Sequence, residues 1–369
     1  MNEELRTKLK RIHCPGLYCE TAMIRDVLEL YGLRLSGNEC LGLAGILGFA
    51  FVRPDSHLFE LPHCSVTGIP YNAIVPLMVN LNLQYAKFEN QTFDDAVEGI
   101  KYYLKSNIPV IIRVAYNQYY SKVFKEQQHA TGNQGAENIF SVFSNYLPYN
   151  TGTHYILAID YHEENDTIEF VENLFRGSYE MNMETLKKAM NSGQKMCAEN
   201  EWTVIYPFDN VSVNHGHVYK SLRRIVNGME SSIDYNNEAQ NGLFGLKEFI
   251  DDFFLWDKKF DKQTQLENMA LLFLSGGGIY KKEGFYRNSF SKYLVAAEKI
   301  TNVSELGDAC ALYKNLATKW DTFLGYIKFT LSDSMGDIYS DHVKSLLDDI
   351  YDDESKGAEL LKRSMKRMW

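Results

Sequence analysis

A cysteine near the N-terminus is the side chain best placed to act as a nucleophile. Cys19 follows a Pro-Gly loop and opens the stretch CETAMIRDVLELYG, in which apolar residues from Ala22 to Tyr31 recur at helical spacing. A helix N-terminus offers partial positive charge and free N–H groups, which favour a thiolate and bind the oxyanion that forms on an attacked carbonyl. Cys19 is therefore a candidate catalytic nucleophile; the alternative is a buried structural cysteine at a helix start.

Two neighbours of Cys19 bear on this role. Glu20 opposes a thiolate by like charge, so the site requires a cation close to the sulfur. Cys14 is a second candidate nucleophile, but it precedes Pro15 in a loop and has no helix N-terminus behind it. The pattern therefore favours Cys19 over Cys14.

A cysteine nucleophile needs a base, and His154 is the best candidate. It opens a predicted strand directly after the polar stretch Asn150-Thr151-Gly152-Thr153, so its ring can reach a cleft at the loop end of the strand. His154 follows Cys19 by 135 residues, which falls within the spacing found in papain-like enzymes.

A third group should orient the imidazole. Asn173 ends the strand predicted to pair with that of His154, and its side chain is expected to accept the ring N–H of that histidine. Glu172 is the alternative partner, but we expect it on the opposite face of the strand. Asp160 shares the face of His154 but lies six residues along the strand, about 20 Å away.

The oxyanion would take a second donor from upstream of the nucleophile. His13 lies six residues before Cys19 and is a candidate for this role. A surface or capping histidine would fit the same position.

Composition indicates a globular protein. The chain has 369 residues, of which 45% are hydrophobic and 23% charged. Its formal net charge of −10 predicts no nucleic-acid partner. No stretch is apolar enough for a membrane span or a signal peptide, so we expect a cytoplasmic protein with reduced thiols. The six cysteines include no C-x-x-C pair, so no metal site is predicted.

The pattern of elements predicts an α+β fold in two domains. Residues 1–215 mix helical and strand patterns, with a long polar loop or lid at 116–150, whereas 216–369 show helical periodicity alone and are predicted to be all-helical. The likeliest linker is 231–242. Predicted helices are 1–12, 19–31, 72–81, 91–107, 183–193, 218–230, 243–256, 262–275, 285–300, 303–331, 335–350 and 356–368; predicted strands are 109–114, 154–162, 168–173 and 201–208.

Several of these segments resemble the N-terminal domain of the butirosin biosynthesis protein H family. The matching motifs are the Cys-containing run, a Leu-Ser turn, a Gly-rich apolar segment, a Leu-Pro-Tyr segment and the end of the hairpin: Tyr18–Met23, Leu35-Ser36, Leu41–Phe49, Tyr146–Tyr149 and Val171–Asn173. The C-terminal half resembles the helical domain that commonly follows in this family, through Gly276–Gly278, Gly284–Arg287, Phe290–Leu294 and Trp320.

A more remote resemblance links the start of the chain to bacteriocin-processing cysteine peptidases. There His13 would occupy the position of the oxyanion glutamine, six residues before Cys19. The chain departs from the butirosin family at three positions: Tyr18 stands where a His precedes the Cys, Gly37 replaces a Glu, and Asn173 replaces an Asp. The change at Tyr18 bears on substrate recognition more than on catalysis.

The resemblance implies a papain-like fold and acyl transfer. An acyl group would leave the phosphopantetheine arm of an acyl carrier protein, rest on Cys19 as a thioester and pass to a small-molecule amine as an amide, in natural-product biosynthesis. No bound cofactor or metal is implied. Tyr18, Glu20 and Tyr149 lie in the matching segments and are candidate substrate-binding residues beside His13.

Two other functions use the same residues. A cysteine peptidase or amidase would have the same triad with water as the acceptor, and a catalytically silent binding module would keep the fold without the chemistry.

An acidic enzyme that docks an acidic carrier protein must gather its basic residues locally. The aromatic content, 13% of residues, is compatible with a homodimer. Candidate docking clusters are Lys8, Lys10 and Arg11; Arg223 and Arg224; and Lys362, Arg363, Lys366 and Arg367.

Overall fold

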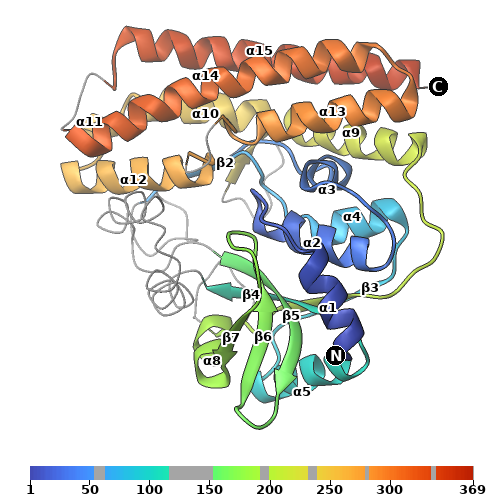
Figure 1. Cartoon of the computed structure of the whole chain (residues 1–369). Coiled ribbons are helices and arrows are strands. Elements are labelled where there is room, and N and C mark those ends of the chain that lie inside the picture. The colour runs from blue at the N-terminus through green and yellow to red at the C-terminus, as the bar shows by residue number, and fades with distance from the viewer. Residues whose placement is uncertain are drawn as a thin grey trace. The chain divides into compact units, whose positions relative to one another are not determined.

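A computed structural model describes residues 1–53, 63–115, 153–191, 199–231, 239–278, 282–333 and 338–368. The protein combines helices with antiparallel sheets, which confirms the predicted α+β class (Figure 1). The predicted loop at 116–150, with the candidate binding residue Tyr149, lies outside the described residues.

The described residues form two compact units. The first holds residues 1–40, 73–115, 153–191 and 199–212. The second holds residues 41–53 and 63–72 together with the described residues from 213 onward, so an N-terminal segment groups with the C-terminal helices. The division into domains 1–215 and 216–369 stays a prediction, because grouping by contacts does not test independent folding.

The first unit is built on a six-stranded antiparallel sheet. Its strand order is β3-β8-β4-β5-β6-β7, and the predicted hairpin is formed by β5 and β6. The sequence analysis missed the short strands β3 and β7. The strands are β3 (Tyr85–Phe88), β8 (Trp202–Ile205), β4 (Val110–Ala115), β5 (Thr153–His162), β6 (Thr167–Val171) and β7 (Tyr179–Asn182). The helices of this unit are α1 (Glu3–Ile12), α2 (Cys19–Leu30), α4 (Ile74–Leu81), α5 (Phe93–Lys105) and α8 (Met183–Met190), and α3 (Gly37–Ala44) crosses into the second unit.

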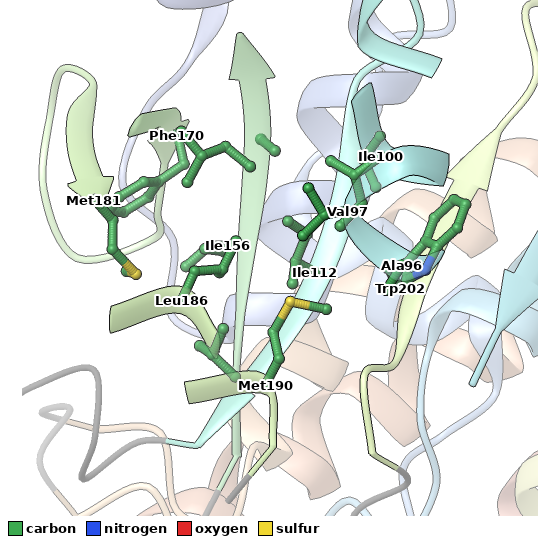
Figure 2. Packing of buried hydrophobic residues seen from close by; sticks show 14 of the residues in the cluster. Ala96, Val97, Ile100, Ile112, Ile156, Phe170, Met181, Leu186, Met190 and Trp202 are labelled. Carbon is green, nitrogen blue, oxygen red and sulfur yellow. The ribbon is translucent and has the colours of Figure 1, made fainter. Parts of the chain in front are cut away.

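Helices α5 and α8 close a hydrophobic core over this sheet (Figure 2). Ile100 of α5, Leu186 of α8 and Ile156 of β5 belong to one buried cluster, and Trp202 stacks on Phe88 with ring centroids 4.0 Å apart. Each large apolar side chain buried in this way contributes about 1.5–3 kcal/mol. The core fixes the sheet from which β5 and β6 carry candidate site residues.

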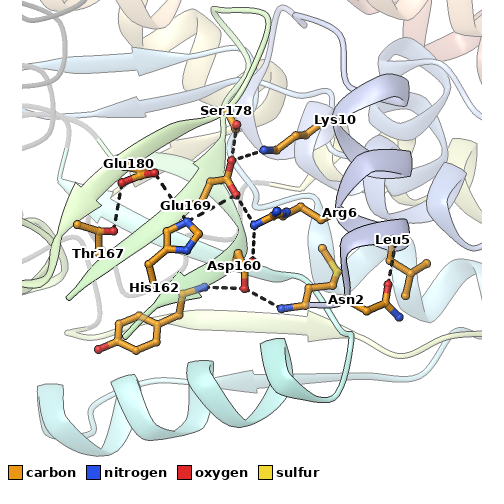
Figure 3. A network of polar contacts seen from close by, with 12 residues as sticks. Asn2, Leu5, Arg6, Lys10, Asp160, His162, Thr167, Glu169, Ser178 and Glu180 are labelled. Carbon is orange, nitrogen blue, oxygen red and sulfur yellow. Dashed lines mark hydrogen bonds and ion pairs between the residues drawn. The ribbon is translucent and has the colours of Figure 1, made fainter. Parts of the chain in front are cut away.

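Ion pairs hold α1 against the β5–β6 hairpin (Figure 3). Arg6 lies 2.7 Å from Asp160, and Lys10 pairs with Glu169. Glu169 also accepts a hydrogen bond from the hydroxyl of Ser178 at 2.5 Å. Because α1 leads into the loop before Cys19, this network ties the start of that loop to the hairpin that carries His154.

The second unit is mainly helical but also contains a three-stranded antiparallel sheet of order β2-β1-β9. Strand β9 lies within the region predicted to be all-helical, a correction to that prediction. The strands of the second unit are β1 (Ala50–Val52), β2 (Ser65–Thr67) and β9 (Ala239–Asn241). Its helices are α9 (His215–Glu230), α10 (Gly242–Phe253), α11 (Trp256–Lys259), α12 (Lys262–Ser275), α13 (Arg287–Thr301), α14 (Glu305–Asp333) and α15 (Asp341–Arg367).

The helices predicted at 335–350 and 356–368 form the single helix α15. The acidic stretch between them continues the helix because it contains neither Gly nor Pro, and Lys319 of α14 pairs with Asp353 at 2.8 Å. Glu354, fully buried, accepts hydrogen bonds from Arg287 at 2.7 Å and from the indole of Trp320 at 3.0 Å. Arg287 also donates to the carbonyl of Gly48 at 2.8 Å, so this buried ion pair joins three helices to the segment just before β1.

Gly42 marks a tight contact in this unit. A Cβ at Gly42 would lie 2.0 Å from the buried ring of Tyr293, so Gly42→Ala is expected to lower the free energy of unfolding by about 1–3 kcal/mol. Urea unfolding measures this change. The control is Gly325→Ala at an exposed position of α14, where a Cβ meets nothing within 4 Å and Ala should stabilise by about 1 kcal/mol. If Gly42→Ala were as stable as wild type, this contact would not constrain the packing.

Candidate active site

Cys19 is the first residue of α2, as predicted. Tyr18 before it is extended, with φ −116° and ψ 121°, and its carbonyl accepts the hydrogen bond from Ala22 N at 3.0 Å. The N-cap residue Tyr18 makes no side-chain capping hydrogen bond to this helix end. Cys19 is partly exposed, and the backbone N–H groups of the first turn, which have no acceptor within the helix, lie beside it.

His154 lies behind this sulfur. It is almost fully buried near the start of β5, where it pairs with Val114 of β4. Its ring is hydrogen-bonded to Cys19, and its Nε2 lies 3.0 Å from Oε2 of Glu172. Burial lowers the pKa of His154, but the hydrogen bonds and negative charges of Cys19 and Glu172 outweigh it and raise the pKa to about 10. The imidazolium is therefore the cation that the sequence required beside Cys19.

The carboxylate of Glu172, and not the amide of Asn173, orients His154. The reason is the register of the hairpin: Leu157 pairs with Val171, so the next residue, Glu172, falls on the face of Ile156 and His154. Asn173 falls on the other face. The second oxygen of Glu172 accepts a hydrogen bond from Leu174 N at 3.2 Å, which fixes the carboxylate. The expectation that Glu172 faces away was wrong.

Asn173 binds the loop before Cys19 instead. Its Nδ2 donates to the carbonyl of Gly16 at 2.9 Å, and its own carbonyl accepts from Gly16 N at 2.8 Å. Asn173 is buried, and its side-chain oxygen has no hydrogen-bond partner among the described residues. It therefore lies at the site without being the group that orients the imidazole.

His13 does not supply an oxyanion donor in this structure. Its Nδ1 lies 2.6 Å from Asp26 and its Nε2 lies 2.9 Å from the carbonyl of Phe175, so both ring nitrogens are engaged. Burial lowers the pKa of His13, but the hydrogen bond and charge of Asp26 and the carbonyl of Phe175 raise it above its ordinary value. With an acceptor on each nitrogen, His13 fits an imidazolium that donates twice.

Glu20 and Tyr18 form a second small network. Glu20 is fully buried and accepts hydrogen bonds from Ile74 N at 3.0 Å and from the hydroxyl of Tyr18 at 3.2 Å. Burial raises the pKa of Glu20 to about 7, against these hydrogen bonds and the charge of Arg113. The carboxyl group of Glu20 therefore accepts a hydrogen bond at the N-terminus of α4, and its burial leaves it without access to a substrate.

The arrangement suits nucleophilic catalysis by a thiolate. An accessible sulfur at a helix N-terminus, a buried imidazole and a fixed carboxylate supply nucleophile, base and orienting group. Across the described ranges, no group of three or more His, Cys, Asp and Glu side chains is arranged to hold a metal ion. No helix in the same ranges is both long and apolar enough to cross a bilayer.

The fold and site define an α+β protein with a Cys–His–Glu arrangement of the kind that forms covalent acyl intermediates. Residues 18–134 match the family described as butirosin biosynthesis protein H, N-terminal, so this part of the chain has the predicted family resemblance. The matched segment contains Cys19, whereas His154 and Glu172 follow it. No curated protein matches the chain.

Glu172→Gln is expected to slow the alkylation of Cys19 by iodoacetamide at pH 7 by about tenfold, because a hydrogen bond to a charged group contributes about 1.5–3 kcal/mol. The neutral amide holds the imidazole of His154 less firmly than the carboxylate does, so the ring is less often in position to activate the sulfur. Peptide mass spectrometry measures the rate as a function of pH. Glu163→Gln in the turn of the same hairpin, an exposed carboxylate that pairs with Lys105 of α5, serves as the control. An unchanged rate in Glu172→Gln would contradict this role for the carboxylate.

Proposed function

We propose that the protein is a biosynthetic acyltransferase that forms an amide through a Cys19 thioester. One observation carries this proposal: the partly exposed thiol of Cys19 is hydrogen-bonded to a buried His154 that Glu172 holds in place. The family match over residues 18–134 adds a biosynthetic context. The proposed donor is the phosphopantetheine thioester of an acyl carrier protein, and the proposed acceptor is a small-molecule amine.

The first half-reaction transfers the acyl group to the enzyme. The Cys19 thiolate attacks the thioester carbonyl, and the N–H groups at the start of α2 stabilise the oxyanion. The tetrahedral intermediate collapses with loss of the pantetheine thiolate, which takes the proton from the His154 imidazolium. The products are acyl-Cys19, neutral His154 and free pantetheine thiol.

The second half-reaction releases an amide. The amine attacks acyl-Cys19, neutral His154 accepts the amine proton, and Cys19 leaves as a thiolate. This restores the starting ion pair. Exchange of one thioester for another is close to thermoneutral, whereas formation of the amide is downhill, so the second step draws the reaction forward.

The proposal places the protein in the cytoplasm, where a nucleophilic thiol stays reduced. Among the described residues, Cys14, Cys19, Cys40 and Cys310 are free thiols. The proposal needs no metal or resident cofactor, because the carrier supplies the activated acyl group. A homodimer and the carrier-docking clusters stay predictions.

An intact-mass experiment tests the acyl-enzyme. Exposure to short acyl-pantetheine thioesters should add one acyl group to the protein, and Cys19→Ala should abolish the adduct. His154→Ala should slow its formation by a factor of about 10²–10⁴, the usual contribution of a general acid–base group. Cys14→Ala is the matched control and should acylate at the wild-type rate, because Cys14 is exposed and takes no part in the Cys19–His154–Glu172 contacts.

Amine acceptors then separate transfer from hydrolysis. Release of the acyl group as an amide, faster with amine than in buffer alone, supports the transferase. Release as the free acid at the same rate with and without amines would identify a hydrolase. No adduct with any thioester, with Cys19 also slow to alkylate, would indicate a binding module.

A further inference from the structure

The loop that precedes Cys19 is joined at three points to the segment that follows Glu172. Gly16 N donates to the carbonyl of Asn173 at 2.8 Å, and Asn173 Nδ2 donates to the carbonyl of Gly16 at 2.9 Å. Farther along, His13 Nε2 lies 2.9 Å from the carbonyl of Phe175. Two side chains and four backbone groups therefore fasten these segments together, although Gly16 and Asn173 lie 157 residues apart in the chain.

The same loop is fastened to α2 by buried charges. Asp26, fully buried, lies 2.6 Å from His13 Nδ1 and 2.7 Å from the guanidinium of Arg25. Arg25 also donates to the carbonyl of Cys14. Each oxygen of the buried Asp26 carboxylate has a hydrogen-bonding partner, so the loop cannot move away from α2 without taking His13 from a buried charge.

These contacts connect the residues next to Cys19 with the residues next to Glu172, the partner of His154. Gly16 precedes Cys19 by three residues, and Asn173 directly follows Glu172, which binds His154. Three residues of chain span at most about 10–11 Å, so the Gly16–Asn173 contact restricts how far the sulfur can lie from the imidazole. A side chain at Gly16 would also meet Ala22 Cβ at 2.8 Å, which shows how closely the loop lies on α2.

We propose that Asn173 and His13 are positioning residues that hold the Cys19 thiol against the His154 imidazole by fastening the Cys19 loop to the end of β6. Neither residue touches the reacting atoms. Asn173 acts through its hydrogen bond to Gly16. His13 acts by hydrogen-bonding to Asp26 through one ring nitrogen and to the carbonyl of Phe175 through the other. The inference rests on the Cys19–His154 pair proposed above as the reactive centre.

The test compares two buried asparagines that make the same kind of hydrogen bond. Asn200 Nδ2 donates to the carbonyl of Gln91 at 2.8 Å, and both asparagines are buried and have a side-chain oxygen with no partner among the described residues. Asn200 also has a left-handed backbone, with φ 52°, which Ala tolerates poorly. Asn200→Ala should therefore lower Tm at least as much as Asn173→Ala.

The readout is the rate of iodoacetamide alkylation of Cys19 at pH 7, relative to that of Cys310, a partly exposed cysteine of α14, in the same sample. Asn173→Ala is expected to lower this ratio about tenfold, and Asn200→Ala to leave it within twofold of wild type. His13→Ala should lower it at least as far. His13→Gln, whose amide keeps donor hydrogens near these acceptors, should recover part of the loss.

Two outcomes would overturn the inference. One is a wild-type ratio in folded Asn173→Ala and His13→Ala; the other is an equal fall in Asn200→Ala, which would attribute the effect to general destabilisation. If Asn173→Ala does not fold by circular dichroism, the two His13 variants decide. Alkylation needs no acyl donor, so a protein that transfers no acyl group but shows the expected ratios would refute the proposed function and keep the positioning role.

Discussion

A buried positive charge must have negative partners, and the imidazolium of His154 is the charge on which the candidate site depends. Burial alone would drive its proton off, yet Cys19 on one side and Glu172 on the other hold it. Each partner must then be fixed in turn. Leu174 N holds the carboxylate, and the first turn of α2 holds the sulfur. The core under β5 and the ion pairs of α1 matter to function because they support the two ends of this contact.

The two histidines near Cys19 show how surroundings divide one residue type between two roles. Both have a raised pKa caused by a carboxylate neighbour. Both ring nitrogens of His13 are hydrogen-bonded to oxygen atoms of the protein, so neither nitrogen can exchange a proton with a reacting group. His154 has an acceptor on Nε2 and a thiol as its other partner, and a thiol can exchange a proton with it. The geometry therefore separates a structural cation from a proton-transfer group, which residue type alone does not do.

Periodicity in the sequence predicted the elements that carry the site. The apolar spacing after Cys19 correctly predicted where α2 begins, and the turn residues after residue 162 predicted the β5–β6 hairpin. The short strands β1, β2, β3, β7 and β9 were missed, because strands of three or four residues contain too few alternations to show a pattern. The choice between Glu172 and Asn173 depended on register, and a slip of one residue moves every side chain to the other face. The role of His13 depended on Asp26, a charge inside a helix whose burial follows only from the tertiary fold.

The pairing of β1 with β9 has a consequence for how the protein is made. Ala50 lies opposite Asn241, so a strand near the start of the chain gains this neighbour only after about 190 further residues have been synthesised. The buried guanidinium of Arg287 likewise reaches back to Gly48. At a synthesis rate of about 5–20 residues per second, residues 41–53 wait on the order of ten seconds or more for these partners. During that interval the Gly-rich apolar segment has left the ribosome but lacks the partners that bury it in the folded protein, so it is exposed to aggregation.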